Sequence, residues 1–410
     1  MTAPVSPDST LDDVVTLGCR LNLAESEAIR AMLAGAAGRT VVVNSCAVTA
    51  EAVRQSRRAV RRLRRAHPDA RLVVTGCAAT IEPDTFAAMG EVDAVVPNPA
   101  KLTPQSWLAP AADLSPPPHH TAAHHASMHH TRAFVPVQTG CDHACTFCII
   151  PAGRGAGVSS PVDDVIRRIA AHLAHGVNEV VLTGVDVTGW GADLPDTPRL
   201  GDLVAAILVA FPTLPRLRLS SLDGVEIDDA LFEILTGEAR VMPHVHLSLQ
   251  SGDDMVLKRM KRRHSRAQAI DLVERLVARR PQIAIGADLI AGFPTETDAM
   301  HANNLSLIAA ARIVHGHIFP YSPRPGTPAA RMPQVDPVLV RARAGALRAA
   351  VADQRAAWLR TLVGHPREVL AERDGTGHSG EFAPYRLPPG TAAGSLVTMT
   401  PRTITEGLLA

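Results

Sequence analysis

Residues 140–148 read Gly140-Cys141-Asp142-His143-Ala144-Cys145-Thr146-Phe147-Cys148 and place three cysteines within one short loop. They follow a β-prone run, Phe134–Gln138, so the thiols lie just after a strand. We call Cys141, Cys145 and Cys148 the loop trio. Three thiolates at C-x3-C-x2-C spacing can hold one face of an iron–sulfur cubane and leave the fourth iron free. A structural zinc knuckle would need a fourth ligand, for which His143 is the nearest candidate.

The loop trio opens a series of six βα repeats. The expected strands are short β-prone runs separated by helical patterns: Phe134–Gln138, Glu179–Thr183, Arg216–Ser220, His244–Leu249, Ile283–Leu289 and His315–Phe319. This alternation predicts a barrel or partial barrel of parallel strands, in which ligands bind at the carboxyl ends. We expect the barrel domain to cover residues 132–364, including a long Ala/Arg-rich helix at Pro337–Leu362.

An α/β unit precedes the barrel and covers residues 11–103. Its β-prone runs and helical patterns alternate: strands at Asp13–Leu17, Thr40–Asn44, Arg71–Thr75 and Asp93–Val96, and helices near Ala24–Leu33, Glu51–Arg65 and Asp84–Met89. The alternation predicts a parallel sheet with helices on its faces, similar to a flavodoxin or Rossmann domain.

Three further cysteines occupy equivalent positions in that sheet. Cys19, Cys46 and Cys77, which we call the sheet trio, each follow the end of an expected strand. Because the carboxyl ends of parallel strands meet at one edge, the three thiols should converge. A single free cysteine is often only a small buried hydrophobe. Three in this arrangement favour an iron–sulfur cluster or a zinc ion with one coordination position open.

The composition bounds the class of protein. The 410 residues are 46% hydrophobic and 20% charged, which excludes a chain that is disordered throughout. No apolar run approaches the ~18 residues that a membrane helix needs. The polar start of the chain lacks the hydrophobic part of a secretory signal. We therefore expect a cytoplasmic protein, with no membrane partner, whose cysteines are not paired in disulfides.

Two segments differ from the rest of the chain. Residues 104–131 contain Pro116-Pro117-Pro118 followed by three histidine pairs, a composition that predicts a linker. Such a tract could bind a transition metal, but a solvated spacer is the simpler interpretation. Residues 365–410 are β-like and rich in Gly and Pro, which predicts a small terminal β-domain.

Together these features resemble a known family. C-x3-C-x2-C after the first barrel strand resembles the radical S-adenosylmethionine superfamily, and the preceding three-cysteine domain resembles its methylthiotransferases. Six stretches resemble the branch that acts on N6-threonylcarbamoyladenosine in tRNA: Thr16–Asn22, Glu25–Glu27, Asn44–Thr49, Val74–Cys77, Thr139–His143 and Cys148–Pro151. Ala152 stands where the family usually has an aromatic residue, and Ser45 where it usually has threonine. Neither is a ligand, but Ala152 leaves the packing of the cluster loop open.

The resemblance implies a role for each trio. The loop trio would hold the [4Fe-4S] cluster that cleaves S-adenosylmethionine to a 5′-deoxyadenosyl radical. The sheet trio would hold an auxiliary [4Fe-4S] cluster that carries the sulfur to be transferred. One S-adenosylmethionine would methylate that sulfur and a second would supply the radical, so that a methylthio group joins C2 of the adenine next to the anticodon, position 37. No general acid or base is assigned, and the electron donor and sulfur donor are unknown.

The ends of the barrel strands supply the candidate residues for binding S-adenosylmethionine. They are small or polar residues at or just after the expected strands: Gly184, Ser220, Ser221, Gln250 and Asp288. Gly184 resembles the glycine-bearing segment that meets the methionine amine in this superfamily. Each of the five could instead serve only a strand-to-helix turn.

A stripe of arginines is the candidate contact to tRNA. Six arginines of segment 51–65 recur at helical spacing, and we call them the arginine stripe: Arg54, Arg57, Arg58, Arg61, Arg62 and Arg65. Like charges at this spacing destabilise an isolated helix, so the stripe favours an anionic partner, although a solvated charged face is the common alternative. The run Lys258–Arg266 is a weaker candidate. Residues 377–382 faintly resemble the small RNA-binding β-barrel, a TRAM-like domain, that ends these enzymes.

Other functions stay open on the sequence. Related methylthiotransferases modify isopentenyladenosine in tRNA or an aspartate of a ribosomal protein. A non-enzymatic alternative is a zinc-stabilised RNA-binding module that uses both trios structurally. The iron and sulfide content of protein prepared without air separates these two classes.

Overall fold

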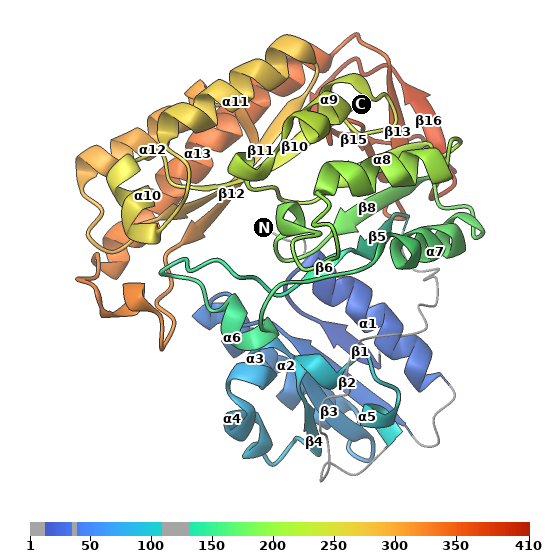
Figure 1. Ribbon diagram of the computed structural model, residues 1–410, viewed down its shortest axis with the longest axis vertical. Coiled ribbons are helices and arrows are strands. Elements are labelled where there is room, and N and C mark those ends of the chain that lie inside the picture. Colours follow the sequence, from blue (N-terminus) through green and yellow to red (C-terminus); the bar gives the residue numbers. More distant parts are fainter. Residues whose placement is uncertain (1–12, 35–38, 109–130) are drawn as a thin grey trace.

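The computed structural model describes residues 13–34, 39–108 and 131–410. Its N-terminal part is a parallel four-stranded sheet of order β1-β2-β3-β4, drawn in blue at the bottom of Figure 1. The strands are β1 (Val14–Thr16), β2 (Thr40–Ser45), β3 (Arg71–Gly76) and β4 (Ala94–Val96). The helical elements are α1 (Arg20–Leu33), α2 (Ala50–Ala66), α3 (Cys77–Ile81), α4 (Pro83–Ala87), the 3-10 turn η1 (Asn98–Ala100) and α5 (Gln105–Leu108).

Both faces of this sheet are buried, which explains the continuous valine runs of its strands. Val41 and Val43 pack in one cluster with the apolar side of α2, whereas Val42 and Val73 pack in another with Ile29 of α1. The parallel α/β prediction is confirmed. The strand order runs in sequence, without the reversal of order that a doubly wound sheet shows.

Six parallel strands form the middle of the molecule and confirm the predicted repeats. They are β5 (Ala133–Pro136), β8 (Glu179–Thr183), β9 (Arg216–Leu219), β10 (His244–Gln250), β11 (Ala284–Ala291) and β12 (Ile313–Pro320). They form two sheets, β5-β8-β9 and β10-β11-β12, which isolated bridges join at Leu217–Val241 and Leu222–Leu247. Within the described residues β12 does not pair with β5, so the barrel is a partial one.

Helices cover the outside of the partial barrel, as Figure 1 shows. They are α7 (Val162–Leu173), α8 (Leu200–Ala210), α9 (Asp229–Gly237), α10 (Asp254–Met260), α11 (Arg266–Arg279), α12 (Asp298–Ala310) and α13 (Pro337–Leu362). The main core lies between these helices and the strands. Short elements shape the loops: β6 (Gln138–Thr139), α6 (Ile150–Arg154), β7 (Val158–Ser159), η2 (Val187–Gly189), η3 (Gly224–Glu226) and η4 (Pro328–Arg331).

A six-stranded sheet of order β16-β13-β14-β15-β18-β17 follows α13 and lies at the upper right of Figure 1. Its strands are β13 (Arg367–Ala371), β14 (Thr376–Ser379), β15 (Pro384–Arg386), β16 (Leu396–Met399), β17 (Ile404–Thr405) and β18 (Leu408–Leu409). Val369 and Tyr385 of this sheet pack with Leu359 and Leu362 of α13, so the helix and the sheet share one small core.

The predicted linker of residues 104–131 is wrong at its start. Residues 105–108 form α5, and Trp107 is buried against the N-terminal sheet, where its indole Nε1 donates to the carbonyl of Lys101. Burial of a large aromatic side chain is favourable, and the burial of Trp107 extends the N-terminal domain past residue 103. The histidine pairs lie outside the described residues. Among those that are described, no helix combines the length and the hydropathy of a membrane span.

Candidate cluster and cofactor sites

The loop trio is held from both ends of its loop. The amide of Cys141 donates to the carbonyl of Gly155 at 3.1 Å. The amide and hydroxyl of Thr146 donate to the carbonyls of Met260 and Arg259 at the end of α10. Gly140 has φ +71°, and a Cβ there would lie 1.8 Å from the carbonyl oxygen of Ala156, so only glycine fits. The loop is therefore fixed between β6 and α10.

The surroundings of the loop trio determine the protonation state of its thiols. Burial raises the pKa of the Cys141 thiol to about 12 and that of Cys148 to about 11. At neutral pH these thiols are therefore protonated in the free protein, and a cluster must displace their protons. The guanidinium of Arg262 lies 3.8 Å from the sulfur of Cys145, where it favours a negatively charged ligand.

The sheet trio lies at the carboxyl edge of the N-terminal sheet. Cys19 caps α1, Cys46 follows β2, and Cys77 begins α3 directly after β3. A Cβ at Gly18 would lie 2.8 Å from the sulfur of Cys46, which shows how closely the loop after β1 approaches that cysteine. Burial raises the pKa of the Cys46 thiol to about 11, and charges on Cys19 and Cys77 add to the rise. All three cysteines lie at the edge of the sheet where the sequence predicts that their thiols converge.

The spacing of the sulfurs bears on the kind of metal. The groups of three ligand atoms that lie within 4.8 Å of one another in the described residues include neither trio. A zinc ion with Zn–S bonds of ~2.3 Å would bring its sulfurs to roughly 3.8 Å from one another. Neither complete trio is that compact in the described residues. His143, the alternative zinc ligand, lies 2.8 Å from a carboxylate oxygen of Asp186, and both lie within 4.8 Å of the sulfur of Cys141.

A buried ionic group joins the two cysteine sites. Arg154 of α6 donates to both carboxylate oxygens of Glu25 on α1, at 2.8 and 2.9 Å, and to the side chain of Asn22 at 2.6 Å. Lys101 lies 2.5 Å from the same carboxylate. Two buried cations thus share one buried anion, which leaves one excess positive charge. Burial lowers the pKa of Arg154, but Glu25, with smaller contributions from Cys77 and Cys19, raises it above its usual value.

The excess charge lies next to the sheet trio, where an anionic cluster would neutralise it.

The segment around Arg154 also shows how the cluster loop packs without an aromatic residue at position 152. Ala152 is exposed, and the cluster loop packs through Gly153 instead, where a Cβ would lie 3.3 Å from the Cβ of Cys77. Asn98 donates to the carbonyl of Gly153 at 2.5 Å and lies 3.5 Å from the sulfur of Cys77. The missing aromatic ring therefore does not leave the loop unpacked.

Gln138 was not predicted and organises the loop after β8. Its side-chain oxygen accepts from the amides of Val185 and Asp186 at 3.1 and 2.8 Å, and its amide nitrogen donates to the carbonyl of Gly140. Gly184 packs against it, since a Cβ there would lie 2.8 Å from the backbone oxygen of Gln138. The position of Gln138 two residues before Gly140 was the signal that could have identified it.

Three other candidate cofactor residues lie at strand ends as expected. The hydroxyl of Ser220 is buried and has no hydrogen-bond partner among the described residues, so it is available for a hydrogen bond to a ligand. Ser221 is exposed. Gln250 ends β10 with φ +67°, beside a register shift between β10 and β11, and such strain in a non-glycine residue is common at binding sites.

Asp288 differs from its expected place at a strand end. It lies within β11, where its carboxylate oxygen is 3.0 Å from Nε2 of His246 and 3.2 Å from Nδ1 of His317. Burial alone would raise the pKa of Asp288, but the two histidine hydrogen bonds outweigh it and hold the pKa well below its usual value. The carboxylate is thus ionised and faces the interior of the barrel.

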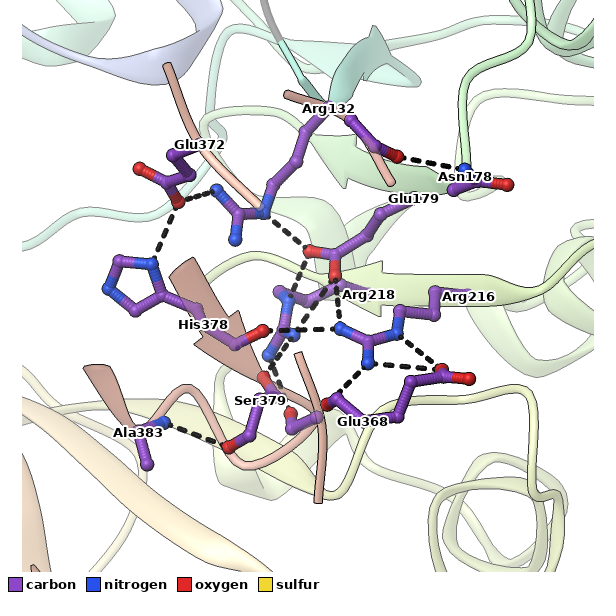
Figure 2. A network of polar contacts seen from close by, with 12 residues as sticks. Arg132, Asn178, Glu179, Arg216, Arg218, Glu368, Glu372, His378, Ser379 and Ala383 are labelled. Carbon is purple, nitrogen blue, oxygen red and sulfur yellow. Dashed lines mark hydrogen bonds and ion pairs between the residues drawn. The ribbon is translucent and has the colours of Figure 1, made fainter. Parts of the chain in front are cut away.

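A second ionic network ties the barrel to the C-terminal sheet, as Figure 2 shows. Glu179 of β8 is completely buried and accepts from Arg132 and Arg218, each at 2.8 Å, with Arg216 at 3.6 Å. Arg218 also donates to the carbonyl of Gly380 in the C-terminal sheet, at 3.0 Å. Burial would raise the pKa of Glu179, but the arginines hold it far below its usual value.

Helix α2 carries the arginine stripe on its exposed side. Arg57 is half-buried and paired with Glu82, whereas Arg54 and Arg58 both pair with Glu51. Arg62 and Arg65 are exposed and make no ion pair among the described residues. The stripe is therefore positive, but less so than the sequence alone implied.

The second basic run, Lys258–Arg266, contains arginines that form ion pairs and hydrogen bonds within the protein. Arg262 and Arg263 each lie 3.0 Å from the buried carboxylate of Asp223, and Arg266 donates to the carbonyls of Gly252 and Asn303. These three arginines are engaged within the protein, which weakens the prediction that Lys258–Arg266 contacts RNA.

Comparisons with known proteins identify the family. Residues 135–308 match the radical SAM superfamily, and residues 13–97 match a group described as uncharacterized protein family UPF0004. The structure resembles that of the radical S-adenosylmethionine methyltransferase TsrM from Kitasatospora setae, with a TM-score of 0.51 over 74% of this chain and 66% of that one. At 14% identity this likeness concerns the fold alone.

Sequence relatives are much closer. The chain is 43% identical to the threonylcarbamoyladenosine tRNA methylthiotransferase MtaB of Rickettsia prowazekii, over 97% of this chain and 96% of that protein. It is 33% identical to a tRNA-2-methylthio-N(6)-dimethylallyladenosine synthase of Paracoccus denitrificans, over 88% of this chain and 86% of that protein. The chain therefore belongs to the methylthiotransferases of the radical SAM superfamily, enzymes that use S-adenosylmethionine and a [4Fe-4S] cluster.

Proposed function

We propose that this enzyme adds a methylthio group to C2 of N6-threonylcarbamoyladenosine next to the anticodon of tRNA. The observation that carries the proposal is the pair of cysteine trios, one at the mouth of the partial barrel and one at the edge of the N-terminal sheet, with α6 packed on α3 between them. The identity of 43% to the threonylcarbamoyladenosine enzyme of Rickettsia prowazekii, against 31–35% to the dimethylallyl enzymes compared, favours the first substrate.

The donor sets fit the clusters that the proposal needs. The loop trio would hold the cluster for S-adenosylmethionine, and the sheet trio would hold an auxiliary cluster. When bound, the two clusters supply an electron for cleaving S-adenosylmethionine and a sulfur atom for transfer. Each trio offers three thiols, and a cubane held by three thiolates keeps one iron open to a small molecule.

The protein's own residues position the reactants. Gln138 fixes the loop after β8 beside the cluster loop, and the unpartnered hydroxyl of Ser220 is available for a hydrogen bond to the bound cofactor. Arg154 and Lys101 place a net positive charge against the sheet trio and stabilise anionic sulfur there. We propose Gly184, Ser220, Ser221 and Gln250 as the S-adenosylmethionine site. Asp288 lies deeper and would contact the substrate end of the site.

The test is a nucleoside assay with protein reconstituted without air. With S-adenosylmethionine and a low-potential reductant, tRNA that carries N6-threonylcarbamoyladenosine should gain the methylthio group, seen by mass spectrometry of its nucleosides. Transfer to isopentenyladenosine tRNA, or to neither tRNA, would contradict the proposed substrate. Colourless protein that contains zinc instead of iron would support the RNA-binding module and remove the enzyme assignment.

We further propose that the anticodon arm lies along the arginine stripe. Reversing two charges together, Arg58→Glu with Arg62→Glu, should weaken tRNA binding. It should also lower the slope of log affinity against log salt concentration by about 2, because each lost phosphate contact removes roughly one released counterion. Filter binding at several salt concentrations measures both quantities.

The matched control for the stripe lies on the opposite side of the molecule. Arg275 and Arg279 are exposed arginines, also four residues apart, on α11. Reversing both charges there changes the net charge by the same amount and should leave the salt slope unchanged. Equal losses of affinity in the two double variants would mean that only net charge matters and that the stripe is not the footprint.

A further inference from the structure

Arg20 extends from the auxiliary site into the barrel. It follows Cys19 directly and begins α1. Its guanidinium carbon lies 5.9 Å from the ring of Phe134 on β5 and 6.0 Å from the ring of Phe382 in the turn between β14 and β15. The side chain therefore bridges the space between a proposed cluster ligand and the interior of the barrel.

Arg20 differs from the other arginines around Phe382. Arg218 and Arg132 also lie over this ring, at 4.9 and 5.4 Å, but both are ion-paired with Glu179. Arg20 makes no hydrogen bond and no ion pair among the described residues, and it is only half-buried. It is thus a cation without an ion-pair partner in the described residues, and its donors remain available.

Two carboxylates act electrostatically on Arg20: Glu179, which is already paired with Arg218 and Arg132, and Asp288. The carboxylate of Asp288 is fixed by His246 and His317. Asp288 can accept hydrogen bonds from N–H or O–H groups, whereas Arg20 can only donate. The barrel interior therefore offers one donor site and one acceptor site to the same ligand.

We propose that Arg20 binds the carboxylate of the threonyl group and so selects the acidic substituent of the adenine. This inference rests on the proposed function, since the threonylcarbamoyl group carries one carboxylate beside urea N–H groups and a hydroxyl. Asp288 would accept from the N–H or O–H groups. An uncharged isopentenyl group would leave Arg20 desolvated and unpaired, which disfavours that substrate.

The experiment compares two RNAs on the same protein. One anticodon stem-loop carries N6-threonylcarbamoyladenosine with its free carboxylate, and the other carries the neutral threonine amide. Reconstituted wild-type enzyme should bind the acid about 10- to 100-fold more tightly, as expected for a charged hydrogen-bonded pair. Arg20→Gln should bring the ratio close to 1, and Arg20→Lys should restore part of it, because lysine keeps the charge but not the paired donors.

The ratio is robust to partial loss of the auxiliary cluster, because such a loss affects both RNAs alike. Iron content and S-adenosylmethionine affinity are measured on each variant. An unchanged ratio in Arg20→Gln, or equal binding of both RNAs by the wild type, overturns the inference. A selective loss of S-adenosylmethionine affinity would assign Arg20 to the cofactor's carboxylate and overturn it as well. Wild-type enzyme that does not modify threonylcarbamoyladenosine at all defeats the proposed function itself.

Discussion

Replacing Cys46 with alanine should leave about four irons per chain instead of about eight, the content of one [4Fe-4S] cluster rather than two. The variant should still cleave S-adenosylmethionine to 5′-deoxyadenosine, but it should not methylthiolate tRNA. The reason is that Cys46 belongs to the sheet trio, while the loop trio has its own anchors in β6 and α10. Iron analysis and product quantification measure the three outcomes.

The matched variant Cys145→Ala should lose both products. It should also retain about four irons, now in the auxiliary site. The two substitutions remove the same atom, so a difference between their 5′-deoxyadenosine yields identifies which trio serves cleavage. If both variants kept full iron content, or if Cys46→Ala also stopped cleavage at unchanged iron in the loop site, the assignment of two separate clusters would be wrong.

Replacing Glu179 with alanine should destabilise the enzyme by about 3–5 kcal/mol, because it leaves Arg218 and Arg132 buried without their anion. The same arginines hold the C-terminal sheet, so that sheet should become the first site of proteolysis. The hydrogen bond from Arg218 to the carbonyl of Gly380 marks the contact that would be lost. Urea unfolding and limited trypsin digestion measure these effects.

Glu233→Ala is the control for this change. Glu233 pairs with Arg279 on the surface, and such exposed pairs contribute about 0–1 kcal/mol. Equal stability losses in the two variants would contradict the role assigned to burial. Because the pKa of Glu179 is lowered in the folded state, its stabilising contribution is complete above its unfolded pKa and is lost only as pH falls toward the folded value. The effect of Glu179→Ala should therefore be constant between pH 6 and pH 8 and should shrink only in acid, a range set by a model glutamate pKa of about 4.3.

Much of the fold followed from local sequence. The six barrel strands and helix Pro337–Leu362 lie where the hydrophobic periodicity placed them. Periodicity reports which side of an element is buried, and that property depends on neighbouring residues along the chain. The start of the linker was misplaced because Trp107 finds its pocket in a sheet formed by distant residues.

The candidate site was predicted less completely. The six cysteines could be grouped because each trio is regular in the sequence, either as C-x3-C-x2-C or as a repeated strand end. Arg154 and Gln138 were not given their present roles, and Asp288 was placed at a strand end instead of within β11. The charge of the arginine stripe was overestimated because Glu82, which pairs with Arg57, lies between α3 and α4, away from the stripe in the sequence.

By itself, the sequence determined the order of strands and helices, the two cysteine trios and the family to which they belong. These features are encoded over a few residues, within the reach of one turn, loop or strand. Only the tertiary structure decided which charges meet, because the partners lie far apart in the chain: Arg154 and Glu25 are separated by 129 residues, and Arg216 and Glu368 by 152. The same packing placed Arg20 against two aromatic rings without an ion pair in the described residues, a property that no local pattern of residues can express.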